Sequence, residues 1–192
     1  ELTLRLTPKP TLEELKPTLK EYEAFIAPEY IQEMRGVAAG AEVDYYAILL
    51  INCFYEVVRK PFQCRQIVAF GKATGSGKLI HGRNFDWPDH FNKLSSNTIV
   101  FYVKPEKGRS FVHVAYPGFI SAFSGSNDAG ITVAKNELGT RAEPGEPDCI
   151  QIRRVLQYAQ TLDEAVDILR KADKSCNYSM MLSSARTRKA VV

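Results

Sequence analysis

The stretch from Gln63 to Trp87, QCRQIVAFGKATGSGKLIHGRNFDW, decides between two folds and two chemistries. Residues 64–74 are rich in strand-forming residues, residues 75–78 (GSGK) are a turn sequence, and a strand pattern resumes at Leu79. The middle of the stretch, GKATGSGK, also looks like a phosphate-binding loop. The stretch is therefore either a β-hairpin or a nucleotide site, and its spacing decides which.

The spacing argues against a phosphate loop. Such a loop needs G-x-x-x-x-G-K-[ST] between a strand and a helix. Counting from Gly71, the second glycine falls on Ser76, and the residue after Lys78 is Leu79 rather than a hydroxyl that could hold magnesium. A strand pattern follows, so no helix N-terminus would point at a phosphate. The sequence predicts a Gly-Ser-Gly hairpin turn and no nucleotide binding.

The first sixty residues predict helices. Thr11 and Glu14 form a capping box for a first helix, in which Pro17 could cause a break. Residues 29–39 carry helical spacing, and Asp44 can cap a third helix that is apolar nearly all round.

The rest of the chain predicts strands, then helices, then strands. Short strand patterns bounded by Gly, Pro or Asn-Asp cover residues 97–105, 109–118, 119–125 and 130–138. Helical patterns cover residues 150–160 and 161–172, the second with a capping box at Thr161 and Glu164, and strands return at 178–184 and 189–192. This order predicts a layered α+β fold with an antiparallel sheet.

Composition excludes several functional classes. The chain has 192 residues, 45% hydrophobic and 24% charged, as in a soluble globular protein, and no apolar run approaches the roughly 18 residues that span a membrane. The basic cluster at 186–189 is short and lacks aromatic residues, so we expect no nucleic-acid partner. Four cysteines without a C-x-x-C pair predict no metal site, and no cofactor is expected. The compartment stays open between the cytoplasm and secretion after signal removal, and a homo-oligomer is left open.

Several motifs together resemble one family. Cys64 heads a strand, a glycine turn follows, and Gly82-Arg83-Asn84-Phe85-Asp86 comes next. This resembles the start of the catalytic chain in N-terminal-nucleophile hydrolases of the acyl-coenzyme A:isopenicillin-N acyltransferase type. These are related to the choloylglycine hydrolase and penicillin V acylase group and to the acid ceramidase and N-acylethanolamine amidase group. Residues 33–52, 118–139 and 161–192 resemble further family segments, so the similarity covers about 29–192.

The resemblance implies a fold and a domain organisation. The implied fold is a four-layer αββα sandwich with antiparallel sheets. Residues 1–63 would be a helical pro-segment that stays associated with the catalytic region, residues 64–192. Relatives continue beyond the position of Val192, so the expectation is that the C-terminal part of the fold is missing. Self-cleavage would occur between Gln63 and Cys64.

The resemblance also implies a mechanism and site residues. Cys64 would be the nucleophile, and its freed α-amine, which titrates near pH ~7.7–8.0, would be the base. Arg83 would lie beside the thiol, Asp86 would contact the α-amine, and Asn136 would be an oxyanion donor or only a strand-end turn residue. Since Arg83 and Asp86 face opposite sides of a regular strand, the strand should end, bulge or twist near Asn84.

Other positions keep two interpretations. Phe85 and Trp87 could line an acyl pocket or belong to the core, and Asn127 could bind substrate but is more typical of a turn. Arg65 stands where relatives have a small hydroxyl residue. The predicted activity is hydrolysis or transfer of the acyl group of a small linear N-acyl amide through a Cys64 thioester. The alternative is a catalytically silent binding domain that keeps the fold.

Overall fold

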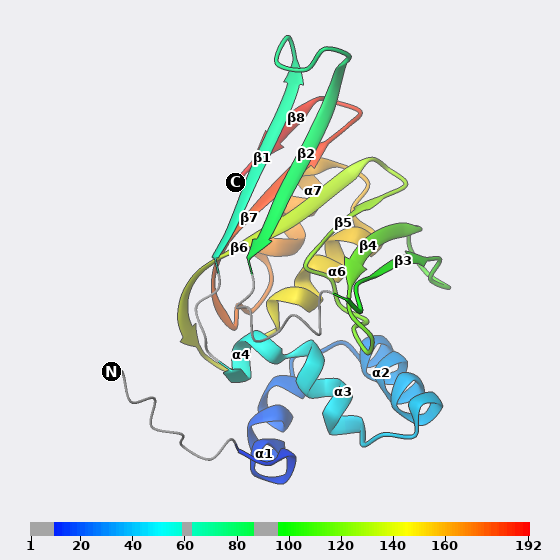
Figure 1. The fold of residues 1–192 in the computed structure, drawn as a ribbon, viewed down its shortest axis with the longest axis vertical. Helices are drawn as coiled ribbons and strands as arrows, with labels where there is room; N and C mark the ends of the chain where they lie inside the picture. The colour runs from blue at the N-terminus through cyan, green and yellow to red at the C-terminus, as the bar shows by residue number, and fades with distance from the viewer. Residues whose placement is uncertain (1–9, 59–62, 87–95) are drawn as a thin grey trace.

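The computed structural model describes residues 10–58, 63–86 and 96–192, and it is an α+β fold with antiparallel sheets, as predicted (Figure 1). The helices are α1 (Leu12–Glu23), α2 (Pro28–Ala41), α3 (Tyr45–Asn52), α4 (Phe54–Val58), α6 (Asp148–Tyr158) and α7 (Leu162–Arg170). The strands are β1 (Gln63–Gly71), β2 (Gly77–Asp86), β3 (Ile99–Val103), β4 (Phe111–Ala115), β5 (Ser124–Asn127), β6 (Ile131–Ala142), β7 (Cys176–Ser184) and β8 (Lys189–Val191).

The helix starts follow the predicted caps. Thr11 and Glu14 form the full capping box of α1, which continues through Pro17 without a break. Asp44 caps α3, but the predicted single helix is divided because Cys53 leaves the helical conformation (φ −113°, ψ 24°). At α7 the Thr161 hydroxyl accepts from the Glu164 N–H, while the Glu164 carboxylate accepts from Gln160 rather than from the cap residue.

The strands form two sheets. Six strands lie in the order β3-β4-β5-β6-β7-β8, every neighbouring pair antiparallel, and β1 with β2 makes a separate hairpin. Gly71 and Gly77 flank the hairpin turn with φ of 61° and 68°, a conformation that side-chain-bearing residues rarely adopt. The structure therefore confirms the predicted hairpin turn at this stretch.

The described residues form three stacked layers. Helices α6 and α7 cover one face of the six-stranded sheet, where Ile131, Val133, Leu156 and Leu182 belong to one buried core. The β1–β2 hairpin packs against β6 on the opposite face. Its outer face is open, with Ile67 67% exposed, so no fourth layer covers the hairpin within the described part of the chain.

Helices α1 to α4 pack against one end of the sheet rather than forming that outer layer (Figure 1). They share a second core with the rest of the chain, in which Leu49 packs with Ile120 and Ile150. The buried Asn52 side chain donates to the Gly118 carbonyl (3.0 Å) and accepts from the N–H groups of Ile120 and Ser121 (both 3.0 Å). The helical segment is thus joined to the sheet region by both apolar and polar contacts.

Crossing a bilayer would require a helix of sufficient length and apolar character. None of the helices in the described ranges meets that requirement.

Candidate active site

The regular pairing of β1 with β2 decides which side chains face the six-stranded sheet. The register runs from Gln63 opposite Asp86 to Ala69 opposite Ile80, and its one shift lies between Ala69 and Gly71, beside the turn. Alternate residues therefore share a face. The inner face carries Cys64, Gln66, His81, Arg83 and Phe85.

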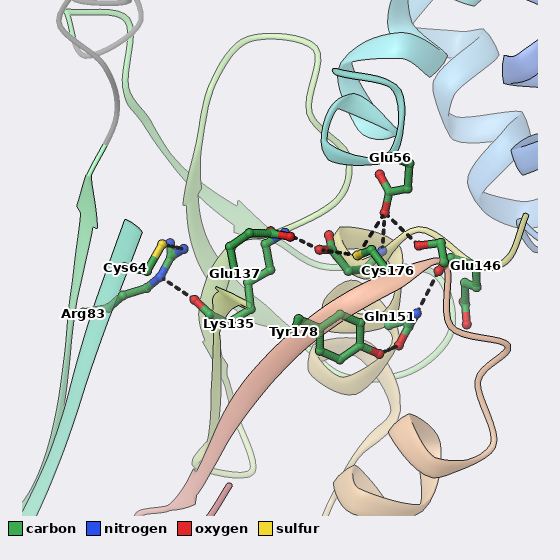
Figure 2. A network of polar contacts seen from close by, with 11 residues as sticks. Glu56, Cys64, Arg83, Lys135, Glu137, Glu146, Gln151, Cys176 and Tyr178 are labelled. Carbon is green, nitrogen blue, oxygen red and sulfur yellow. Dashed lines mark hydrogen bonds and ion pairs between the residues drawn. The ribbon is translucent and has the colours of Figure 1, made fainter. Parts of the chain in front are cut away.

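The side chain of Arg83 is held against the thiol of Cys64 (Figure 2). Its Nη2 donates to Cys64 Sγ at 3.2 Å, and its Nε donates to the Lys135 carbonyl oxygen at 3.1 Å. The guanidinium also lies 4.7 Å from the centre of the Phe85 ring. A guanidinium that donates to sulfur would stabilise negative charge developing there as the thiol reacts.

The other three cysteines have a different environment. Burial raises the pKa of Cys53, Cys149 and Cys176 well above the ordinary value for a thiol. The Cys176 thiol additionally donates to Asp148 Oδ2 at 3.3 Å. Cys53 and Cys149 are buried, and Cys176 is half-buried like Cys64 but faces a carboxylate, whereas Cys64 lies beside a guanidinium.

Asp86 does not share the face of Cys64. Of the end, bulge or twist expected near Asn84, the described hairpin has no bulge there, and β2 ends two residues later. Asp86 is the last residue of β2 and lies opposite Gln63, on the exposed outer face together with Arg65 and Asn84. The uncleaved chain thus brings Arg83, but not the Asp86 side chain, to the thiol.

Asn136 lies on β6, on the face toward the hairpin. Its Oδ1 accepts a hydrogen bond from Gln66 Nε2 at 2.9 Å, which ties it to the strand that carries Cys64. The preceding residue, Lys135, holds Arg83 through its carbonyl oxygen. The adjacent β6 residues Lys135 and Asn136 therefore contact the hairpin separately, one through Arg83 and the other through Gln66.

The predicted substrate-binding residues have different positions. Phe85 faces inward and stacks on Phe123, with ring centres 5.2 Å apart, as part of a cluster of aromatic residues. Trp87 lies outside the described residues. Asn127 donates to the carbonyls of Leu156 and Ala159 and accepts from the N–H groups of Ala129 and Ile131. These four bonds use the whole capacity of the amide, so we assign Asn127 a structural role.

A buried charge network next to the site was not predicted from the sequence (Figure 2). Lys135 is 1% exposed, and its ammonium forms ion pairs with Asp148 and Glu137. Burial opposes this charge, but Asp148 and the neighbouring acidic groups outweigh burial and raise the pKa of Lys135. The sequence did contain a signal that Lys135 is buried, because this residue alternates with Ile131 and Val133 on the core face of β6.

The acidic part of this network could be mistaken for a metal site. The ligand atoms of Glu56, Asp148 and Cys176 lie within 4.8 Å of one another. However, the Lys135 ammonium already binds Asp148, and Glu56 accepts from the Asp148 N–H and the Ser175 hydroxyl, both at 2.9 Å. Burial and the charge of Asp148 raise the pKa of Glu56 to about 7. We therefore describe the cluster as an ion-pair network and assign it no metal.

Comparison with known proteins identifies the family. Residues 73–192 match the family model described as acyl-coenzyme A:6-aminopenicillanic acid acyl-transferase. An uncharacterized protein of Archaeoglobus fulgidus is 26% identical over 199 residues, which cover 90% of this chain and 33% of that protein. Protein dcd1A of Dictyostelium discoideum is 28% identical over 169 residues, which cover 82% of this chain and 38% of that protein. The chain spans about a third of the length of these curated relatives.

A solved structure shows the same fold. The Caenorhabditis elegans ortholog of N-acylethanolamine-hydrolyzing acid amidase matches with a TM-score of 0.50 and 21% identity, over 62% of this chain and 54% of that one. The resemblance that the motifs predicted, to N-terminal-nucleophile hydrolases, is confirmed. The family model covers more than half of the sequence, and this chain belongs to the acyl-coenzyme A:6-aminopenicillanic acid acyl-transferase family.

Proposed function

We propose that this chain belongs to a self-activating cysteine amidohydrolase or acyltransferase in which Cys64 is the nucleophile. Family and fold support acyl transfer or amide cleavage in general. The single observation that carries the more specific proposal is the 3.2 Å contact between Arg83 Nη2 and Cys64 Sγ at the start of β1. A small linear N-acyl amide is the proposed substrate.

Activation is proposed to begin at the bond before the nucleophile. Gln63 and Cys64 are consecutive residues of β1, so the Cys64 nitrogen is part of a peptide bond in this structure. Attack of Cys64 Sγ on the Gln63 carbonyl carbon would form a thioester and break the C–N bond, and the thiol proton would pass to the leaving nitrogen. Water would then cleave the thioester, leaving a carboxylate on Gln63 and a free amine on Cys64.

The freed amine is the proposed base for substrate turnover. It takes the thiol proton, the thiolate attacks the acyl carbonyl, and the amine returns the proton to the leaving nitrogen. Water or an acceptor then resolves the thioester. Asp86 lies opposite Gln63 in the register, one position from the new amine, and we include its contact with that amine in the proposal. In this step, and in the preceding chain cleavage, the Asn136 amide N–H groups would stabilise the developing oxyanion. Phe85 with Phe123 would form part of the acyl pocket.

The N-terminal helices are proposed to stay bound after cleavage. Asn52 and Glu56 both lie before the scissile bond, and both make buried hydrogen bonds with residues after it. Arg153, which is 2% exposed, also forms an ion pair with Glu33 of α2 at 3.0 Å. Release of this segment would leave several buried polar groups without partners, at about 1–3 kcal/mol for each group.

Selective alkylation tests the assignment of the nucleophile. Iodoacetamide added to the native chain is expected to modify Cys64 well before Cys53, Cys149 or Cys176, because only the thiolate reacts and those three thiols are stabilised in the neutral form by burial. Mass spectrometry of peptides from timed samples measures the order, and the unfolded chain, in which all four should react, is the control. A Cys64 that stays unmodified would support the silent binding domain instead.

A further inference from the structure

A chain of hydrogen bonds crosses the layer between the two sheets and ends on the proposed oxyanion donor. His81 Nδ1 lies 2.9 Å from Ser183 Oγ on β7, and His81 Nε2 lies 3.2 Å from Gln66 Oε1. Gln66 Nε2 in turn donates to Asn136 Oδ1 at 2.9 Å. Gln66 and His81 come from the hairpin that carries Cys64, whereas Ser183 and Asn136 come from the larger sheet.

The bond between Gln66 and Asn136 fixes the direction of every other bond in the chain. Because Gln66 donates through its amide nitrogen, its oxygen is left to accept from His81 Nε2, which must carry a hydrogen. His81 Nδ1 is then the acceptor for the Ser183 hydroxyl. Burial lowers the pKa of His81 and keeps the ring neutral, so one tautomer satisfies both neighbours.

The orientation of the Asn136 amide matters because its two ends have opposite effects on a reacting carbonyl. The NH₂ group stabilises a developing oxyanion, whereas the carbonyl oxygen of the flipped amide would repel it. With Oδ1 bound to Gln66, the NH₂ group is the end of the Asn136 amide that this bond leaves for another partner. A free side-chain amide has no comparable preference between the two orientations.

We propose that Gln66, His81 and Ser183 are positioning residues that hold the Asn136 amide in the donor orientation. This inference rests on the proposed function, in which Asn136 is the oxyanion donor. None of the three residues is assigned a contact with substrate. The competing role is a purely structural cross-link between the sheets, and two measurements separate the two roles.

The first measurement is the tautomer of His81, read from the ring ¹⁵N chemical shifts of the native chain. The His81→Gln variant identifies which of the three histidine signals belongs to this residue. The hydrogen-bond chain from Ser183 through His81 and Gln66 to Asn136, here called the relay, requires hydrogen on His81 Nε2 and none on Nδ1. A ring with hydrogen on Nδ1 would reverse every bond in the chain, turn the Asn136 carbonyl toward the site, and overturn the proposal whatever the activity.

The second measurement is a double-mutant cycle on the rate of chain cleavage between Gln63 and Cys64. Asn136→Ala should slow cleavage on the order of 100-fold, the usual effect of losing one oxyanion donor. Gln66→Met fills similar space but makes no hydrogen bonds. Freeing the Asn136 amide in this way should slow cleavage by about 10-fold, which is less than the effect of removing that amide. In the double variant, Gln66→Met should add nothing, because no Asn136 amide remains to be positioned.

Controls distinguish failure of the relay from failure of the proposed function. Alkylation of Cys64 forms no oxyanion, so Gln66→Met should leave the rate of alkylation unchanged. Gln160→Met, at an exposed glutamine, should likewise leave that rate unchanged. Additive slowing in the double variant, or slower alkylation in Gln66→Met, would indicate general disruption and overturn the relay. If Asn136→Ala cleaves at the normal rate, or the native chain never cleaves, the proposed function itself fails and the relay fails with it.

Discussion

Replacing Lys135 by Met is expected to lower the free energy of unfolding by about 3–5 kcal/mol, the usual result of removing one partner from a buried ion pair. The Lys135 ammonium is the cation shared by Asp148, which is 0% exposed, and Glu137, whose side chain is 6% exposed. It also lies 3.5 Å from the centre of the Tyr55 ring. Methionine would fill much of the space but leave two carboxylates inside the core without a counter-charge.

The pH dependence of this loss follows from the carboxyl groups. In the variant, the folded chain gains stability by binding protons that remove the unpaired charge, and this gain is lost as the pH rises. The loss of unfolding free energy caused by Lys135→Met should therefore be smaller near pH 5 than near pH 8. Urea unfolding curves at both pH values measure it, with Lys20→Met at an exposed position of α1 as the matched control, expected within about 0.5 kcal/mol of the native chain. An equally small effect for Lys135→Met would contradict a structural role for the network.

Replacing Arg83 by Met is expected to slow both alkylation of Cys64 and cleavage before Cys64, each by roughly 10- to 100-fold at neutral pH. The guanidinium is the cation that contacts Sγ, and its second bond, to the Lys135 carbonyl, fixes its position. Arg83→Lys keeps the charge but not the planar fork that makes both bonds, so an intermediate rate is expected.

The matched control for Arg83 is Arg65→Met. Arg65 lies on the same hairpin but on its exposed outer face, so its loss removes the same charge without touching the thiol. Timed iodoacetamide labelling and the rate of appearance of cleaved chain measure the two effects. Equal rates for Arg83→Met and the native chain, or equal slowing by Arg65→Met, would contradict a direct role of the guanidinium at Cys64.

The sequence predicted the elements that depend on local signals. The Thr11 capping box, the Asp44 cap and the glycine turn of the hairpin are fixed by residues within a few positions of one another, and all three are present. The strand parity was also sufficient to predict that Arg83 and Asp86 face opposite sides. Of the end, bulge or twist expected near Asn84, no bulge is present, because the β1–β2 ladder is continuous from Gln63 to Ala69, and β2 ends at Asp86.

The rest of the site depends on contacts between residues far apart in the sequence. The bonds from Arg83 to Lys135 and from Gln66 to Asn136 cross between the two sheets and span 52 and 70 positions. The ion pair of Lys135 with Asp148 joins a strand to the first turn of a helix. Residue type and spacing do not specify which sheet faces lie together, so the bonding partners of Gln66, His81 and Lys135 could not be assigned in advance.

Cys64 is proposed to break the bond that precedes it, and the intact mass of the chain after incubation measures that break. Two products are expected, one ending at Gln63 and one beginning at Cys64, and a Cys64→Ala variant should remain a single chain under the same conditions. A native chain that remains whole, or a Cys64→Ala chain that breaks between residues 63 and 64 at the native rate, would contradict it.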